Sequence, residues 1–252
     1  GYLSMIVKLL KEIKPDYLAF CYDRPEPSFR KDIYPEYKAN RSEMPEDLAP
    51  QIPYIKQLTE ALGIPAFEMQ GFEADDLIGT FAVMGEKHNL DVVIVSGDKD
   101  FSQLINDHII MYDTMKDTRF TVEKVVEKWG VEPKYFIDYL ALTGDSSDNI
   151  PGVRGVGPKG AQKLINEFHT VEEIYKRIDD VKNPSLKNKL LESQEMAMLS
   201  KKLVTIETDV KVDIGINDLK MRERKTEELE KLLEELEFQS FKKNLVSLDQ
   251  SQ

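Results

Sequence analysis

Acidic side chains in four short groups are the part of this sequence best suited to chemistry. The groups are Asp23; Glu73, Asp75 and Asp76; Asp98 and Asp100; and Asp145 and Asp148. So many carboxylates cannot gather in one place unless protons or cations neutralise them. Hard divalent cations prefer oxygen ligands, so the sequence predicts that Mg²⁺ or Mn²⁺ binds where these groups meet.

Each of the first three groups follows a short apolar stretch. The stretches are 17–22 (YLAFCY), 64–69 (IPAFEM) and 91–96 (DVVIVS), and helical patterns separate them. Short apolar runs bounded by turn residues and separated by helices are typical of parallel strands in an α/β sheet. Ligands bind beyond the carboxyl ends of such strands, so we expect the acids to meet at one edge of the sheet.

The remaining pattern divides the chain. Before residue 144, we expect a further strand at 108–112 and helices at 1–13, 51–62, 73–87, 100–106, 122–129 and 133–143. After it come only helical patterns, at 158–168, 170–178, 186–191, 193–204 and 225–237, with a short extended piece at 210–214. This change predicts an α/β core over 1–143, a helical region over 144–245 and a tail or linker over 246–252.

Composition limits the class of protein. The chain has 252 residues, 41% hydrophobic and 32% charged, which is ordinary for a soluble domain. It has no 18-residue apolar run and no signal peptide, so we expect no membrane span. Cys21 is the only cysteine and lies in a predicted strand, which indicates a buried residue in a reducing compartment, the cytoplasm. The net charge of −12 argues against nucleic acid unless basic residues cluster and bound cations reverse the local field.

Basic residues do cluster in the long connection 24–50. Between residues 24 and 41, five of them outnumber three acids: Arg24, Arg30, Lys31, Lys38 and Arg41 against Glu26, Asp32 and Glu36. Phe29, Tyr34 and Tyr37 are interleaved with them. Basic and aromatic side chains together suit a single-stranded nucleic acid, because bases stack on the rings while cations neutralise the phosphates. A solvated loop is the alternative interpretation.

A second basic element follows Asp148. Three glycines, Gly152, Gly155 and Gly157, form a hairpin between two predicted helices. Its N–H groups can point outward beside a helix N-terminus, which makes a phosphate cradle, and Arg154, Lys159 and Lys163 add positive charge. Such contacts give affinity without sequence information.

Taken singly, each acidic group also fits a helix cap or a turn. His88, His108 and His169 lack zinc-site spacing, and the sequence has no Ser-His-Asp set, Walker loop or GxGxxG motif. The order of the groups and of the basic elements therefore carries the interpretation.

In that order, the motifs resemble the 5′-nuclease (flap endonuclease-like) family, with the N-terminal 5′–3′ exonuclease domain of bacterial DNA polymerase I as the closest match. The resemblance covers residues 1 to about 245. The matching motifs are Tyr22-Asp23, Ser28–Arg30, Tyr34–Arg41, Gly71–Asp76, Ser96–Asp100 and Thr143–Gly157.

The resemblance implies a PIN-like α/β core with a mostly parallel central sheet flanked by helices. It also implies a helical arch or clamp over 24–50 and a C-terminal helix–three-turn–helix DNA-binding region. By resemblance, the first metal site is lined by Asp23, Glu73, Asp75 and Asp76, and the second by Asp98, Asp100, Asp145 and Asp148. Tyr37, Lys38 and Arg41 match catalytic arch positions that grip the 5′ end, and loop 152–157 matches a duplex-binding hairpin that can hold K⁺. The implied DNA-binding set is Arg30, Tyr37, Lys38, Arg41, Gly152, Arg154, Gly155, Gly157, Lys159 and Lys163.

The implied activity is hydrolysis of DNA phosphodiester bonds at 5′ flaps, nicks or recessed 5′ ends by two Mg²⁺ or Mn²⁺ ions, in replication and repair. We expect a monomer that acts beside a fused or separate polymerase. The family opens with a strand that ends in a metal-binding aspartate, and since the helical pattern starts at Gly1 we expect that strand to be missing here.

Two alternatives remain: a non-catalytic, structure-specific DNA-binding module, and a ribonuclease or phosphatase on a similar scaffold, against which the hairpin 152–157 argues.

Overall fold

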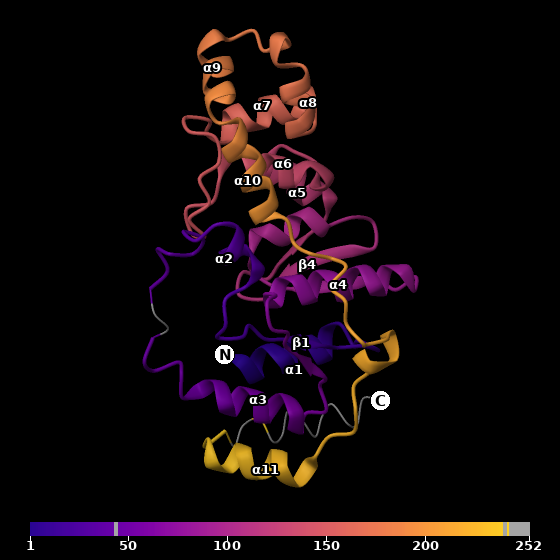
Figure 1. Ribbon diagram of the computed structural model, residues 1–252. Coiled ribbons are helices and arrows are strands. Elements are labelled where there is room, and N and C mark those ends of the chain that lie inside the picture. The colour runs from indigo at the N-terminus through magenta and orange to yellow at the C-terminus, as the bar shows by residue number, and fades with distance from the viewer. Residues whose placement is uncertain (43–44, 239–240, 242–252) are drawn as a thin grey trace. The chain divides into compact units, whose positions relative to one another are not determined.

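The computed structural model describes residues 1–42, 45–238 and 241, so the predicted tail or linker at 246–252 lies outside the described residues. The chain divides into two compact units (Figure 1). The first comprises Gly1–Asp23, Glu43–Met69 and Lys211–Gln252, and the second comprises Arg24–Ser42 and Gln70–Val210. No helix in the described ranges has the length and apolarity needed to cross a membrane.

The first unit packs helices around a very short parallel sheet. Strand β1 (Phe20–Cys21) pairs with β2 (Ala66–Phe67). The helices are α1 (Tyr2–Glu12), α3 (Gln51–Ala61), α11 (Thr226–Glu235) and the 3₁₀ helix η4 (Ile216–Leu219). Helix α11 packs beside α3 and buries Leu229 and Leu233, as its amphipathic pattern predicts.

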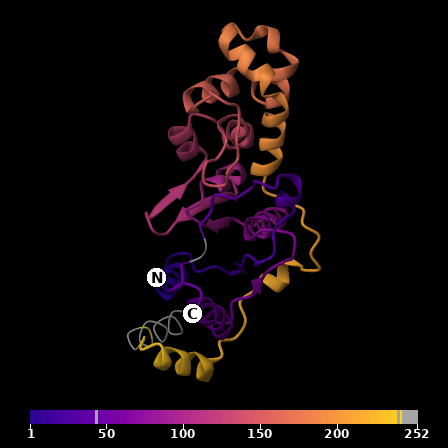
Figure 2. The same cartoon turned by 60° about the vertical axis from the view of Figure 1, so that its left-hand side comes forward.

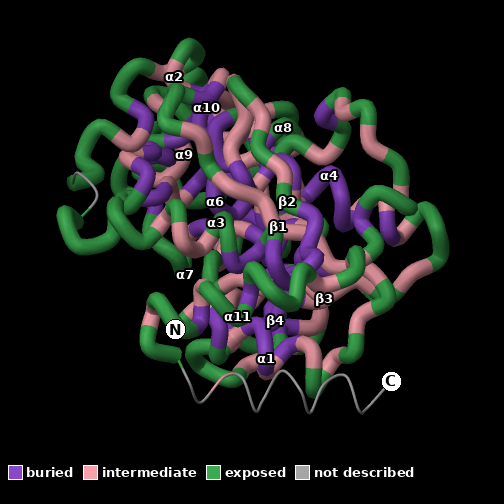
Figure 3. Tube along the Cα trace, turned by 90° about the horizontal axis from the view of Figure 1, so that it is seen from below, coloured by how far each residue is buried: buried purple, intermediate pink, exposed green. Residues whose placement is uncertain are grey.

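The second unit contains a three-stranded sheet in the order β3-β4-β5 (Figure 2). Strands β3 (Val92–Val95) and β4 (Ile109–Asp113) are parallel, and β5 (Thr118–Phe120) is antiparallel to β4. Strand β4 is almost completely buried (Figure 3), and α4 (Ala74–Lys87) packs against β3. Helix α5 (Val122–Trp129) follows β5.

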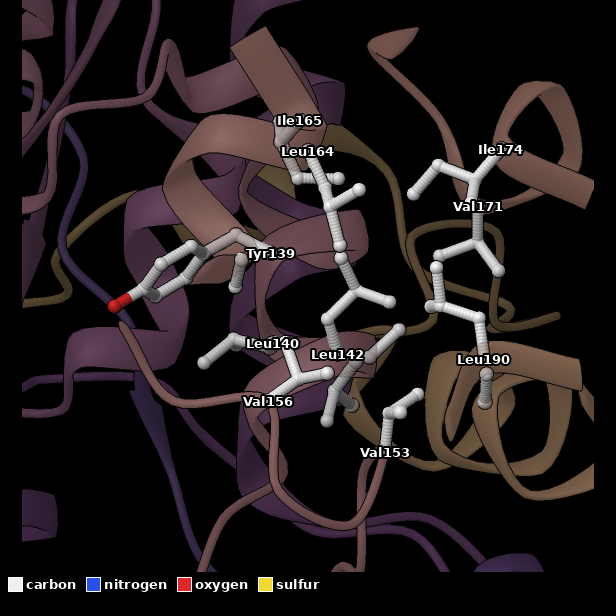
Figure 4. Packing of buried hydrophobic residues seen from close by; sticks show 14 of the residues in the cluster. Tyr139, Leu140, Leu142, Val153, Val156, Leu164, Ile165, Val171, Ile174 and Leu190 are labelled. Carbon is white, nitrogen blue, oxygen red and sulfur yellow. The ribbon is translucent and has the colours of Figure 1, made fainter. Parts of the chain in front are cut away.

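Helices make up the rest of the second unit. They are α2 (Phe29–Ile33), α6 (Phe136–Thr143), α7 (Pro158–Phe168), α8 (Val171–Lys176), α9 (Pro184–Glu192) and α10 (Gln194–Val204), with the 3₁₀ helices η1 (Lys99–Leu104), η2 (Pro133–Tyr135) and η3 (Ile178–Asp180). Helix α6 is central and packs most extensively against α10. Leu140 and Leu142 of α6 lie among side chains of the hairpin and of α7 (Figure 4). This core supports the loop that carries Asp145 and Asp148.

Most predicted helices agree with the structure within one or two residues. The strands differ more: 17–22 and 64–69 shrink to two paired residues each, partly because Pro65 has no N–H with which to extend the ladder. The segment 100–106 forms a 3₁₀ helix, and 210–214 forms no strand. Strand β5 was not predicted, because its three residues are defined by their pairing with β4 and not by a pattern of their own. The parallel pairs thus lie in two small sheets, and the boundary near 143 stays a prediction.

Cys21 is only partly buried, so the expectation of a fully buried cysteine was wrong. Among the described residues, the sheet that contains its strand has two strands, β1 and β2.

Two glycines fix the loop that follows α6. Gly144 has φ +69° and Gly152 has φ +63°, a region that favours glycine. A Cβ on Gly144 would lie 2.4 Å from the carbonyl oxygen of Ile150, and one on Gly152 would lie 2.4 Å from the Gly144 nitrogen. Asp145 and Ile150 also exchange both backbone hydrogen bonds, at 2.9 and 2.7 Å. The two glycine backbones therefore touch and hold the loop 145–151 against the end of α6.

We expect Gly144→Ala to lower the free energy of unfolding by about 1–3 kcal/mol, because it combines backbone strain with a clash against backbone atoms. Gly157→Ala is the matched control: Gly157 has φ −88°, and a Cβ there would meet nothing within 4 Å. Urea denaturation of both variants measures the effect. Equal losses in the two variants would contradict the close approach of Gly144 and Gly152.

Candidate active site

The ends of three elements position the acidic side chains of the second unit. Glu73 is the N-cap of α4, and Asp98 is the N-cap of η1, where its Oδ1 accepts a hydrogen bond from the Asp100 N–H at 2.9 Å. Asp145 directly follows Gly144 at the end of α6. Helix N-termini favour negative charge, so the positions of Glu73 and Asp98 suit carboxylates. Asp145 follows the C-terminus of α6, so Lys99 and not a helix dipole stabilises its charge.

Tyr37 and Lys38 bind to Glu73. The Glu73 Oε2 atom accepts hydrogen bonds from Lys38 Nζ at 2.9 Å and from the Tyr37 hydroxyl at 3.1 Å. The same hydroxyl lies 3.4 Å from Asp148 Oδ2, so Tyr37 bridges two of the predicted metal-binding residues. Burial raises the pKa of Tyr37, and the charges of Glu73 and Asp148 raise it further, so the phenol keeps its proton as a donor.

The basic segment and the Asp-Ser loop are joined through their backbones. The Lys38 N–H donates to the Asp148 carbonyl at 2.9 Å, and the Asn149 side chain donates to the Glu36 carbonyl at 2.7 Å. Arg41 pairs with Asp148 Oδ1 at 2.5 Å, which raises the pKa of Arg41 even though burial acts in the opposite direction. Two motifs more than a hundred residues apart in sequence therefore form one structure.

Lys99 neutralises the other half of the cluster. Its ammonium pairs with Asp145 Oδ2 and lies 3.4 Å from Asp100 Oδ1. The Asp145 Oδ1 atom also accepts a hydrogen bond from the Ser147 N–H at 2.8 Å. Burial opposes ionisation, but Lys99 and Ser147 together hold the pKa of Asp145 below its usual value.

Asp100 is a carboxylate of the cluster with a buried oxygen that the described residues leave without a hydrogen bond. Its side chain is 15% exposed, and its Oδ1 atom has no hydrogen-bond partner among the residues that the structure describes. Burial raises the pKa of Asp100 to about 7, and the nearby charges of Asp98, Asp145 and Asp148 act in the same direction. Those three carboxylates therefore lie close enough to repel it.

The structure thus brings together five of the predicted metal-binding residues: Glu73, Asp98, Asp100, Asp145 and Asp148. Asp75 is half-buried in the first turn of α4. Asp23 is exposed and belongs to the first unit, so its membership of this cluster stays a prediction.

Three other predicted residues differ from expectation in their surroundings. Arg30 and Tyr37, expected to face DNA, are 3% and 4% exposed. Asp76, expected to face a metal ion, is completely buried and pairs with Arg30 at 2.7 Å.

The glycine hairpin has the predicted turns. Gly152 and Gly155 have φ +63° and +80°, and Gly157 is the N-cap of α7. The N–H of Gly152 donates inward to Ser200 Oγ at 3.0 Å, so it does not point outward as expected. The flanking cations are exposed, and they are Arg154, Lys159 and Lys163.

Sequence reasoning missed several contributors. Lys99 stands between Asp98 and Asp100, and that position could have indicated a cation within the cluster. Ser28 lies in a matching motif, but the sequence did not predict that its hydroxyl donates to Glu73 Oε1 at 3.0 Å. Lys189, which donates to the Gly155 carbonyl at 3.4 Å, gave none either.

The cluster has the donor chemistry of a divalent-cation site. Across the described ranges, no three or more His, Cys, Asp or Glu side chains are arranged to hold a metal ion. Lys38, Arg41 and Lys99 pair with carboxylates of the cluster. The oxygens of the cluster nonetheless all belong to carboxylates, and no described residue donates a hydrogen bond to the buried Asp100 Oδ1 atom. Both observations fit a hard cation such as Mg²⁺ or Mn²⁺.

Comparison with known families defines the class of protein. Residues 1–130 match "5'-3' exonuclease, N-terminal resolvase-like domain", and residues 131–228 match "5'-3' exonuclease, C-terminal SAM fold". The chain therefore belongs to the 5′–3′ exonuclease family.

Its curated relatives are longer proteins. The chain is 42% identical over 251 residues to DNA polymerase I of Caldicellulosiruptor bescii, a match that covers 97% of this chain and 29% of that protein. It is 39% identical over 251 residues to DNA polymerase I of Bacillus caldotenax, covering 98% and 29%. The chain spans less than a third of these relatives' length.

Solved structures show the same fold. A bacteriophage T5 protein co-crystallised with metal ions has a TM-score of 0.71 and 26% identity, with 92% of this chain and 89% of that chain covered. A T5 flap endonuclease complex with DNA and metal ions also has a TM-score of 0.71, with 27% identity and the same coverage. The catalytic core of Rad2 with DNA substrate, at 19% identity and a TM-score of 0.64 over 98% and 83% of the two chains, shares the fold alone. The resemblance to 5′-nucleases and the predicted fold class, an α/β core with a C-terminal helical region, are confirmed.

In EDTA, we expect Asp100 to make the stability of the protein depend on pH. Its pKa is raised from 3.8 to about 7, so the folded state holds a proton that the unfolded chain releases. This contribution is complete below about pH 4 and is lost as the pH rises through 7. The free energy of unfolding should therefore fall between pH 5 and 8 in wild type, and fall less in Asp100→Asn.

Asp107→Asn is the control, because Asp107 is exposed in the loop before β4. Urea denaturation at several pH values gives the three curves. Parallel curves for wild type and Asp100→Asn would contradict the raised pKa.

Proposed function

We propose that this chain is a divalent-metal-dependent nuclease that hydrolyses DNA phosphodiester bonds at 5′ ends, as a 5′–3′ exonuclease and flap endonuclease. The observation that carries the proposal is the cluster of Glu73, Asp98, Asp100, Asp145 and Asp148, with basic residues at its edge. Membership of the 5′–3′ exonuclease family and similarity to a flap endonuclease complex with DNA and metal ions support it.

We assign two metal sites, for Mg²⁺ or Mn²⁺. Glu73 and Asp75 would hold one ion, and Asp98, Asp100, Asp145 and Asp148 would hold the other. When bound, such ions supply an activated water and stabilise the leaving oxygen. Carboxylate oxygens at three element ends support this assignment, because those ends fix the ligands with little conformational freedom.

Lys38 and Arg41 would hold the phosphate that is cut. Their side chains are 24% and 53% exposed, and each contacts a carboxylate of the cluster. Charge-assisted hydrogen bonds from two such cations orient a phosphodiester and offset the charge that develops on it. Tyr37, being buried, would hold Glu73 and Asp148 in place rather than stack on a base.

The DNA would contact two further regions. The exposed cations Arg154, Lys159 and Lys163 beside hairpin 152–157 suit the phosphates of the duplex, and a K⁺ ion at this hairpin is part of the proposal. The segment 24–42 would take the single-stranded 5′ end.

The curated relatives, which are bacterial DNA polymerases I, support a proposal for the biological setting. We place this chain beside a polymerase in the bacterial cytoplasm, where it acts as a monomer in replication and repair on flapped, nicked or recessed DNA. A non-catalytic DNA-binding role would account for the hairpin, but it would not account for the cluster of carboxylates.

We expect Asp98→Asn to lower kcat on a 5′-flap substrate in Mg²⁺ by more than about 100-fold. Losing a residue that only supports a metal ligand costs up to about 100-fold, and Asp98 is itself a proposed ligand. DNA affinity in Ca²⁺, measured by fluorescence anisotropy, should stay within about threefold of wild type. Asp107→Asn, the exposed control, should cut at the wild-type rate. Wild-type turnover by Asp98→Asn would contradict the assignment of Asp98 as a metal ligand.

We expect Lys159→Ala to weaken duplex binding and to reduce the slope of log K against log [salt] by about one. Lys176→Ala is the control, because Lys176 is 74% exposed on α8 and pairs with Glu173. Anisotropy titrations across a range of KCl concentrations give both slopes. An unchanged slope for Lys159→Ala would show that the hairpin does not contact phosphate.

A further inference from the structure

Arg30 of α2 and Asp76 of α4 form a buried, two-point ion pair. Arg30 is 3% exposed and Asp76 is 0% exposed. Arg30 Nη1 donates to Asp76 Oδ2 at 2.8 Å, and Nη2 donates to Oδ1 at 2.7 Å. The fork of the guanidinium matches the two oxygens of the carboxylate.

The chain itself satisfies Asp76 completely. Beyond the two bonds from Arg30, Oδ2 accepts from the Glu73 N–H at 3.0 Å and Oδ1 accepts from the Glu207 N–H at 2.9 Å. An ionised carboxylate offers about four lone-pair sites, and four donors fill them. A metal ion could bind Asp76 only by displacing one of these buried donors.

Arg30 extends the pair to the end of α10. Its Nε donates to the Leu203 carbonyl at 2.9 Å, and its Nη2 donates to the Thr205 carbonyl at 2.7 Å. Burial lowers the pKa of Arg30, but the pairing with Asp76 and the charge of Glu73 more than compensate and raise it, so the guanidinium stays charged. One ion pair thus fastens three segments of the second unit: α2, the start of α4 and residues 203–207.

The ion pair between Arg30 and Asp76 also fixes the position of Glu73. The Glu73 backbone donates to Asp76, and Arg30 Nη1 lies 3.7 Å from Glu73 Oε2. Asp75 differs from Asp76 by about 100° of rotation around α4, so the two neighbours cannot point the same way. Asp75 is half-buried, whereas Asp76 faces Arg30.

We propose that Asp76 is a positioning residue and not a metal ligand, and that its pair with Arg30 holds both Glu73 and the base of the arch in their working positions. This inference rests on the proposed function where it concerns metal binding. Arg30 likewise acts inside the protein, not on DNA.

The test compares Asp76→Asn with Asp75→Asn, its neighbour in the same helical turn. Calorimetric titration with Mn²⁺ should give Asp76→Asn the wild-type number of ions with affinities within about threefold. Asp75→Asn, as a proposed ligand, should lose at least about tenfold in affinity for one ion.

Two further readouts report positioning. Amide hydrogen exchange across 29–33 should accelerate at least tenfold in Asp76→Asn and stay unchanged in Asp75→Asn, because only the first change releases Arg30. On a 5′-flap substrate with saturating Mn²⁺, Asp76→Asn should lower kcat about tenfold with KM within twofold of wild type.

Arg30→Met/Asp76→Asn covers the case in which Asp76→Asn does not fold, because it removes the cation that the single change would strand in the interior. The double variant should recover a folded protein with the wild-type number of Mn²⁺ ions. If the double variant folds where Asp76→Asn does not, the two residues are energetically coupled, as the proposed ion pair requires.

The proposal is overturned if a folded Asp76→Asn, or the folded double variant, binds one Mn²⁺ ion fewer than wild type. It is also overturned if exchange at 29–33 is the same in Asp76→Asn as in wild type. If the wild-type protein binds no Mn²⁺, the proposed function fails, and the exchange at 29–33 still decides whether the pair positions α2.

Discussion

The need to neutralise closely packed carboxylates governs the second unit. Two like charges 4 Å apart repel by about 4 kcal/mol at an effective dielectric constant of 20, so five such groups cannot share a site unaided. The chain supplies its own cations: Lys38 and Arg41 at Glu73 and Asp148, and Lys99 at Asp145 and Asp100. Lys38 and Arg41 belong to the basic segment 24–42, and Lys99 stands between the proposed ligands Asp98 and Asp100. The contacts that neutralise the carboxylates therefore also hold these segments beside the cluster.

This electrostatic arrangement links the basic segment to the acidic loop. Residues 36–41 and 145–149 exchange backbone and side-chain hydrogen bonds, and Tyr37 lies in the apolar cluster built around α6. Under the proposed function, the carboxylates would hold metal ions, and Lys38 and Arg41 would then be available to bind phosphate. Lys38 and Arg41 would then serve two states of the site: they pair with carboxylates in one and with the phosphate that is cut in the other.

Local sequence was enough to predict the parts of the site that depend on element ends. Glu73, Asp98 and Asp145 lie at such ends, where the pattern of apolar residues and glycines located them. It was not enough for Arg30, whose partners Asp76, Leu203 and Thr205 lie 46 to 175 positions away along the chain. A basic residue beside an aromatic one looks the same in sequence whether it faces DNA or the interior. Strand lengths and β5 were also missed, because pairing partners set them and local propensity does not.

The contact between Gly144 and Gly152 has a consequence for how this protein can vary among species. Most surface loops accept inserted residues at small entropic cost. This one is closed by two backbones in contact and by paired bonds between Asp145 and Ile150, so its length is fixed. An extra residue inside it would either break the closure or move Asp148 relative to Asp145. Insertions should therefore collect elsewhere in the chain, and the spacing of these two aspartates should persist after the surrounding sequence has diverged.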